Sequence, residues 1–161
     1  MKPLVIDTNV PIVANGRQGQ PSLDCQTAAI KRLQIAVKSE LILLDSEGEI
    51  QAEYQRHLHP KGQPGVGDYF YRHVLNSMPG RVERRDLPKT AEDEYQHFPA
   101  SLLACKFDPS DRKFVALAKK EAGVVINATD SDWIHHADIL RNEEIEVDNI
   151  CGCDPGTWFQ K

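Results

Sequence analysis

Four acidic residues occupy positions where a carboxylate needs a partner. Asp7 and Asp130 each come soon after a short apolar run, while Glu53 and Asp111 lie on the apolar sides of predicted helices. A carboxylate on a buried side is costly unless it is paired or bound to a metal. We expect no lysine or arginine to pair with Glu53 or Asp111, because none is placed for it by its spacing. Hard divalent cations such as Mg²⁺ or Mn²⁺ prefer oxygen ligands, so the four acids together predict a metal site.

Ordinary structural roles are an alternative for each acid taken alone. An aspartate after a strand suits a turn or a helix cap, and one in a first helical turn favours the helix dipole. The residues with such alternatives are Asp7, Asp108, Asp111 and Asp130. Glu49 lies one turn before Glu53 on the same side of a helix and competes with it for the metal. The roles of Asp108 and Glu49 stay open at the level of sequence.

Alternating strands and helices must position these acids. Short apolar runs predict buried strands at 4–6, 41–44 and 124–126, a last strand at 145–147, and an edge strand or extended arm at 81–87. Apolar residues at helical spacing predict helices at 23–39, 46–59, 69–75, 109–120 and 133–140, the first with Leu23, Ile30, Leu33 and Val37 inward. This order predicts a parallel sheet covered by helices on both faces, whose ligands bind at the carboxyl ends of the strands.

Composition narrows the classes of protein to which the chain can belong. The 161 residues suit one domain, and the net charge of −5 argues against holding nucleic acid by bulk attraction. A nuclease remains compatible, since carboxylates around a metal make the total acidic. With no apolar run of membrane-spanning length and no signal pattern, we expect a cytoplasmic protein with reduced cysteines and no membrane partner. The Cys151–Cys153 pair lacks the second Cys or His pair of a zinc site.

One part of the chain combines basic and aromatic residues. The arginines are Arg72, Arg81, Arg84 and Arg85, and the aromatic residues are Tyr69, Phe70 and Tyr71. Arginines that contact phosphates, together with rings that stack on bases, suit a single-stranded nucleic acid. A solvated basic face above core aromatics is the alternative.

Four segments resemble the acidic motifs of PIN domains, and most closely those of the bacterial VapC-like toxin ribonucleases. They are Val5-Ile6-Asp7-Thr8-Asn9, Glu53-Tyr54, the run from Asp111 to Ala118, and Asp130-Ser131-Asp132-Trp133. The resemblance covers nearly the whole chain, in order. Two departures stand out: Ala128 replaces the usual Thr or Ser two places before the fourth acid, and the segment at about 59–104 is longer than in compact toxins.

The resemblance implies a fold, an activity and roles for residues. The fold is a three-layer α/β/α sandwich in one domain over residues 1–161, and the activity is Mg²⁺- or Mn²⁺-dependent endonucleolytic cleavage of single-stranded RNA. The catalytic metal ligands are Asp7, Glu53, Asp111 and Asp130, with Asp132 beside them. Asn9 supports the site on the substrate side. The four arginines remain candidates for binding RNA from their residue types alone. Implied partners are a second copy of the chain and a small antitoxin-like protein.

Two other functions compete with this one. A phosphatase of the haloacid dehalogenase type also begins with a strand that ends in an aspartate, but it needs a second carboxylate two residues later, where this chain has Asn9. A PIN-like module that binds protein or RNA with little or no catalysis is the rival from another class. Metal-dependent cleavage of a generic RNA separates that module from a nuclease.

A shared carboxylate site makes a prediction about Asp7→Asn, which removes one charge and keeps the shape. Two carboxylates about 5 Å apart repel each other by up to ~3 kcal/mol at an effective dielectric of about 20. We expect Asp7→Asn to melt higher than the parent in EDTA and to gain less from Mn²⁺, as thermal unfolding would show. An ordinary turn-forming aspartate gives the opposite result in EDTA, with an equal gain from Mn²⁺.

Overall fold

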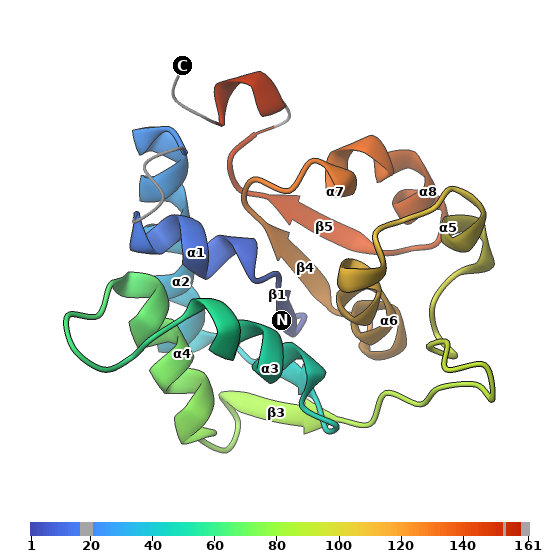
Figure 1. Ribbon diagram of the computed structural model, residues 1–161, viewed down its shortest axis with the longest axis horizontal. Coiled ribbons are helices and arrows are strands. Elements are labelled where there is room, and N and C mark those ends of the chain that lie inside the picture. Colours follow the sequence, from blue (N-terminus) through green and yellow to red (C-terminus); the bar gives the residue numbers. More distant parts are fainter. Residues whose placement is uncertain (17–20, 153, 159–161) are drawn as a thin grey trace.

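The apolar run at the start of the chain forms the central strand of a five-stranded parallel sheet (Figure 1). The computed structural model describes residues 1–16, 21–152 and 154–158. The strands are β1 (Leu4–Ile6), β2 (Ile42–Asp45), β3 (Val82–Arg85), β4 (Val124–Asn127) and β5 (Glu146–Asn149), in the spatial order β3-β2-β1-β4-β5. The predicted parallel sheet is confirmed, and β3 lies at an edge as expected.

The direction of connection between the strands reverses at β1. From β1 the chain continues to β2 on one side, and β4 later pairs with the other side of β1. Leu4 is in register with Ile42 of β2 and with Val124 of β4. Ligands of open α/β sheets bind at such switch points, outside the carboxyl ends of the strands. Residues that follow β1 and β4 therefore share one edge of the sheet.

Helices cover both faces and complete a three-layer α/β/α sandwich (Figure 1). The helices are α1 (Asn9–Asn15), α2 (Leu23–Ser39), α3 (Glu49–His57), α4 (Val66–Asn76), α5 (Ala100–Ala104), α6 (Arg112–Glu121), α7 (Asp132–His135) and α8 (Ala137–Asn142), with short 3₁₀ turns η1 (Pro109–Asp111) and η2 (Pro155–Thr157). The helices α1, α2 and α4 pack together, whereas α6 contacts β1, β2 and β4 with α3 beside it. Within the described ranges, no helix is long and apolar enough to cross a membrane.

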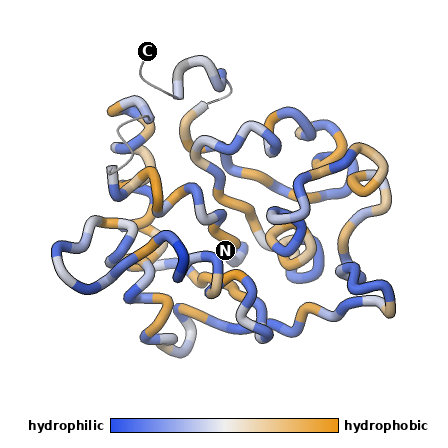
Figure 2. Tube along the Cα trace, viewed as in Figure 1, coloured by the Kyte–Doolittle hydropathy of each residue, from blue (hydrophilic) through white to orange (hydrophobic). Residues whose placement is uncertain are grey.

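The core forms where apolar strands meet the inner sides of the helices (Figure 2). One expectation about it is wrong, because Leu23 is 69% exposed. The buried stripe of α2 runs instead through Cys25, Ala29, Leu33 and Ala36. Small residues in this stripe let α2 pack closely against its neighbours, and a pattern that weights large apolar side chains overlooks them.

Two predicted helices differ in detail from the structure. The segment predicted as one helix at 133–140 forms α7 and α8, which are interrupted at His136. The helix predicted at 109–120 begins with η1, and α6 starts at Arg112. This change from 3₁₀ to α geometry falls next to Asp111, at the start of the best-patterned helix of the sequence.

The long segment at about 59–104 contributes to the core. It contains α4, in which Phe70 and Tyr71 are buried and both pack edge-to-face against Tyr54 of α3. A Cβ atom on Gly67 would lie 1.9 Å from the carbonyl oxygen of Pro11, so α4 approaches α1 at a distance that only glycine permits. Two of the three aromatic residues considered for base stacking are thus core residues, while Tyr69 is 53% exposed.

Candidate metal centre

Three of the four predicted acids come together at the carboxyl edge of the sheet. Asp7 directly follows β1, Asp130 lies in the loop after β4, and Asp111 ends η1. Each offers one carboxylate oxygen, and these three oxygens lie within 4.8 Å of one another. Asp7 and Asp111 are only 3% and 5% exposed. This is the ligand type and crowding that a hard divalent cation requires.

Asp7 is fixed by hydrogen bonds to both of its carboxylate oxygens. The backbone N–H of Asn9 donates to Oδ1 at 3.0 Å, and the indole Nε1 of Trp133 donates to Oδ2 at 2.7 Å. The buried Tyr54 hydroxyl donates to the carbonyl of Ile6, the residue before Asp7. The turn expected of an aspartate after a strand is therefore present, and the same carboxylate still faces Asp111 and Asp130.

The side chain of Asn9 holds the loop that carries Asp130. Its Oδ1 accepts the backbone N–H groups of Ala128 at 2.8 Å and Thr129 at 3.0 Å, and its Nδ2 donates to Asn127 Oδ1 at 3.0 Å. Asn127 Oδ1 also accepts the backbone N–H of Asp130 at 3.1 Å. Asn9 thus acts as a support in this structure, and its contact with substrate stays a prediction.

Asp132 belongs to a second group of carboxylates, which shares Asp111 with the first. Its backbone N–H donates to Asp130 Oδ1 at 2.9 Å, which closes the turn expected there. A second group of carboxylate oxygens within 4.8 Å joins Asp108, Asp111 and Asp132. Asp108 is exposed, and its Oδ1 accepts both the N–H and the hydroxyl of Ser110 at 2.9 Å, as an N-cap residue does.

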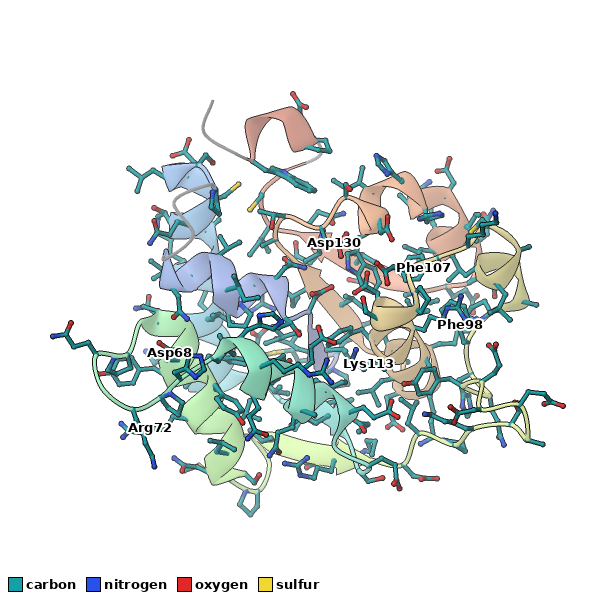
Figure 3. The ribbon with its side chains drawn as sticks, viewed as in Figure 1. Asp68, Arg72, Phe98, Phe107, Lys113 and Asp130 are labelled. Atoms are coloured by element: carbon teal, nitrogen blue, oxygen red, sulfur yellow. The ribbon has the colours of Figure 1, made fainter. Side chains whose placement is uncertain are left out.

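Glu53 is held outside the three-carboxylate group by a lysine. Lys113 of α6 forms an ion pair with Glu53, and the two side chains are 8% and 16% exposed (Figure 3 labels Lys113). The expectation that no cation pairs with Glu53 is wrong, because spacing within one helix does not register a long side chain that reaches from another helix. Glu49 is engaged elsewhere, where it pairs with Lys89 at 2.7 Å and accepts the Tyr95 hydroxyl.

The four arginines do not surround the carboxylates. Arg72 extends outward from α4 at the lower left of the view, away from Asp130 near its upper centre (Figure 3). Arg84 donates to Gln51, and Arg85 pairs with Glu83 and Glu121. Arg81 directly precedes β3, and Arg85 ends it at the carboxyl edge of the sheet. Binding of RNA by these arginines stays a prediction.

Burial and mutual repulsion change the acidity of the group. Burial raises the pKa of Asp7 to about 7, repulsion from Asp130 and Glu53 adds to the rise, and the hydrogen bonds from Asn9 and Trp133 oppose it. Burial raises the pKa of Asp111 to about 10, with repulsion from Asp7 and Asp130 next in size. In the described part of the chain no donor reaches the buried Oδ2 of Asp111. A cation in the group would satisfy this oxygen and displace the proton.

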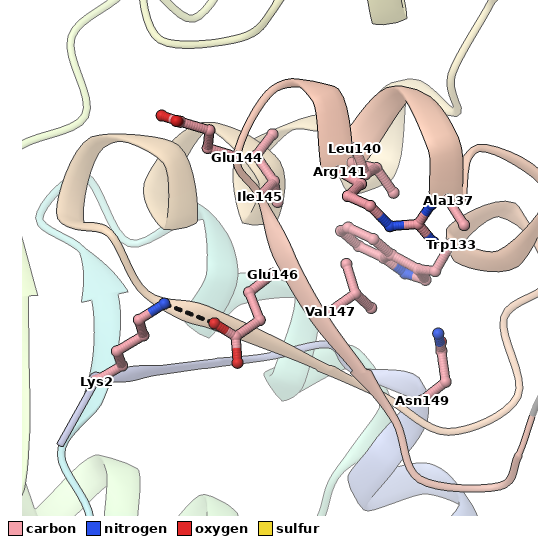
Figure 4. A pocket seen from close by; sticks show the side chains of 10 residues that line it. All are labelled: Lys2, Trp133, Ala137, Leu140, Arg141, Glu144, Ile145, Glu146, Val147 and Asn149. Atoms are coloured by element: carbon pink, nitrogen blue, oxygen red, sulfur yellow. Dashed lines mark hydrogen bonds and ion pairs between the residues drawn. The ribbon is translucent and has the colours of Figure 1, made fainter.

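Sequence reasoning did not anticipate that Trp133 and Lys113 would contact the site. The sequence places Trp133 in the fourth motif and on the apolar side of a helix without giving it a role, yet its indole N–H orients Asp7. It also lines a separate pocket of about 460 Å³ between α8 and β5, where Lys2 and Glu146 form an ion pair at 2.6 Å (Figure 4). A tryptophan three residues after Asp130 was the available signal, but only the fold shows where its N–H points.

Two further observations concern the chain as a whole. Comparisons with protein-family models, with characterised proteins and with solved structures give no match for it. Cys25, Cys105 and Cys151 are free thiols, whereas Cys153, and with it the Cys151–Cys153 pair, falls outside the described residues. The geometry of the carboxylates is therefore the main basis for an assignment of function.

The hydrogen bonds of Asp7 change what we expect of Asp7→Asn. Both carboxylate oxygens accept an N–H group, but an asparagine amide has a single oxygen. One of the two N–H groups would face another donor, and this loss offsets the relief of repulsion. Asp111 provides the clearer test, because no donor among the described residues reaches its buried Oδ2.

We predict that Asp111→Asn stabilises the metal-free protein. With a pKa raised to about 10, Asp111 must take up a proton when the chain folds near neutral pH. Asparagine is neutral in both states, so the change removes this cost and should raise the free energy of unfolding by about 0.5–2 kcal/mol. Thermal unfolding in EDTA near neutral pH should show a higher melting temperature, by about 2–4 °C per kcal/mol, and Mn²⁺ should stabilise the variant less than the parent. Asp138→Asn, on the exposed side of α8, is the control without an effect. A lower melting temperature for Asp111→Asn would show that the charges are not crowded.

The raised pKa values also predict how stability depends on pH. With an ordinary value of 3.8 in the unfolded chain, Asp7 and Asp111 bind more protons in the folded state from about pH 4 upward. Stability of the metal-free protein therefore falls as the pH rises through about 7 for Asp7 and about 10 for Asp111. Melting temperatures in EDTA should be higher at about pH 5 than at about pH 7.5, with a smaller difference in Asp111→Asn. An increase over this range that Asp111→Asn leaves unchanged would contradict the raised values.

Proposed function

We propose that this protein is a divalent-metal-dependent endoribonuclease that cleaves single-stranded RNA. The observation that carries the proposal is the group formed by Asp7, Asp111 and Asp130, whose oxygens lie within 4.8 Å at the switch point of a parallel sheet. Among the described residues no donor reaches the buried Oδ2 of Asp111, and this supports completion of the group by a cation. The likeness of the four motifs to PIN domains adds the phosphodiester substrate.

The residues of the chain prepare the site for this chemistry. Mg²⁺ or Mn²⁺, when bound by the three aspartates, supplies an activated water and neutralises charge on the scissile phosphate. Trp133 and the Asn9 backbone hold Asp7 in one orientation, so that it needs no rearrangement to act as a ligand. The Asn9 side chain holds the loop of Asp130 in the same way. Because these side chains are already ordered, little free energy is lost in ordering the site when metal and substrate bind.

The substrate and partners extend this proposal. Arg81 and Arg84, near the β3 edge, and the exposed Arg72 would contact RNA phosphates, and Arg85 would do so after release from its two acidic neighbours. A second copy of the chain and a small antitoxin-like protein are proposed partners on the strength of the resemblance alone. The toxin role depends on the same likeness.

We predict RNA cleavage that depends on the metal and on the carboxylate group. Purified protein should cleave a mixed-sequence single-stranded RNA with Mn²⁺, lose the activity in EDTA and regain it when Mn²⁺ is restored. Asp111→Asn and Asp130→Asn should each lower the rate by about 100-fold or more, since even outer partners of metal ligands matter by 10–100-fold. Glu49→Gln is the matched control, because Glu49 pairs with Lys89 outside the group.

Two outcomes would contradict the nuclease in different ways. Cleavage that persists in EDTA, or that survives Asp111→Asn, would come from another mechanism or from a contaminant. Uptake of Mn²⁺ without cleavage of any RNA would favour the binding module, in which the same fold recognises a partner without chemistry.

A further inference from the structure

Lys113 is the one buried cation among the residues that the structure describes. It is 7% exposed, and its ammonium group pairs with Glu53 and donates to the carbonyl of Ser110. The same ammonium lies 4.8 Å from the centre of the Phe114 ring. These three contacts fix the charge in one place, unlike that of a solvated surface lysine.

Lys113 is connected to the carboxylate group through its neighbours in sequence and through Glu53. Lys113 follows Asp111 by two residues and reaches from α6 to Glu53 on α3. Glu53 is close enough to Asp7 for the two carboxylates to repel each other. A buried ion pair is retained only with good partners, and loss of one partner leaves the other charge uncompensated. Lys113 and Glu53 thus form a fixed ion pair, and its carboxylate acts on Asp7.

Sites with two metal ions place the second cation about 3.5–4 Å from the first, which requires an additional carboxylate. Glu53 is the carboxylate that the sequence offers for this purpose, and Lys113 already neutralises it. We propose that Lys113 replaces a second divalent ion, so that Asp7, Asp111 and Asp130 hold one ion and the ammonium supplies the other positive charge. This inference rests on the proposed metal-dependent function.

The other acidic group is less suited to a second ion. Asp108 is exposed and uses its Oδ1 to cap η1 through Ser110, and Asp111 would have to serve both groups. Occupation of the group formed by Asp108, Asp111 and Asp132 in the native protein is therefore an outcome that counts against the proposal.

The number of Mn²⁺ ions bound per chain tests the role of Lys113. Calorimetric titration should give one ion for the native protein and for Lys113→Arg, which keeps the charge. Lys113→Met keeps an apolar stem but frees Glu53, and it should bind two ions. The double variant Lys113→Met with Glu53→Gln should return to one. Two ions in the native protein, or one ion in Lys113→Met, would overturn the proposal.

A second measurement uses only the native protein and does not depend on how a variant folds. Anomalous scattering from native crystals soaked in Mn²⁺ should show one peak among the three aspartates, and a second peak at Glu53 or Asp132 would overturn the proposal. RNA cleavage separates this result from the proposed function. If the protein cleaves RNA and binds two ions, the proposed function stands and the proposed role of Lys113 is wrong. If it binds one ion and does not cleave RNA, the role of Lys113 stands and the proposed function is wrong.

Discussion

The close burial of three carboxylates is the constraint on which the rest of this structure depends. Asp7, Asp111 and Asp130 approach within 4.8 Å of one another, and the first two are almost fully removed from water. Desolvation and like-charge repulsion both oppose such an arrangement. The surrounding fold maintains it through a parallel sheet, whose carboxyl edge gathers the ends of β1 and β4, and through the start of α6.

Directed hydrogen bonds maintain the arrangement at the level of side chains. Trp133 orients Asp7, and Asn9 fastens the loop that carries Asp130, so the two strand ends are joined through buried polar contacts. Asp111 differs, because in the described part of the chain its Oδ2 has no donor. The fold satisfies most of the polar atoms around this carboxylate but leaves this oxygen without a donor, which supports the proposed cation over a closed network.

The sequence predicts the strands and the convergence of acids better than it predicts their partners. The runs at 4–6 and 124–126 are short, apolar and rich in β-branched residues, and such runs form buried parallel strands in almost any context. Strand ends then place Asp7 and Asp130 by topology alone. The prediction that Leu23 faces the core is wrong because the buried stripe of α2 consists largely of Cys25 and alanines. The contacts of Lys113 with Glu53 and of Trp133 with Asp7 join segments that are distant in sequence. Local periodicity of apolar residues therefore does not predict them.

The central claim is that the three aspartates form a cation site that holds a proton when no metal is present. Calorimetric titration with Mn²⁺ at about pH 8, repeated in buffers of different ionisation enthalpy, measures the protons released on binding. With the pKa of Asp111 raised to about 10 and that of Asp7 to about 7, binding should release about one proton per chain. Uptake of Mn²⁺ without proton release, or no uptake at all, would contradict the claim.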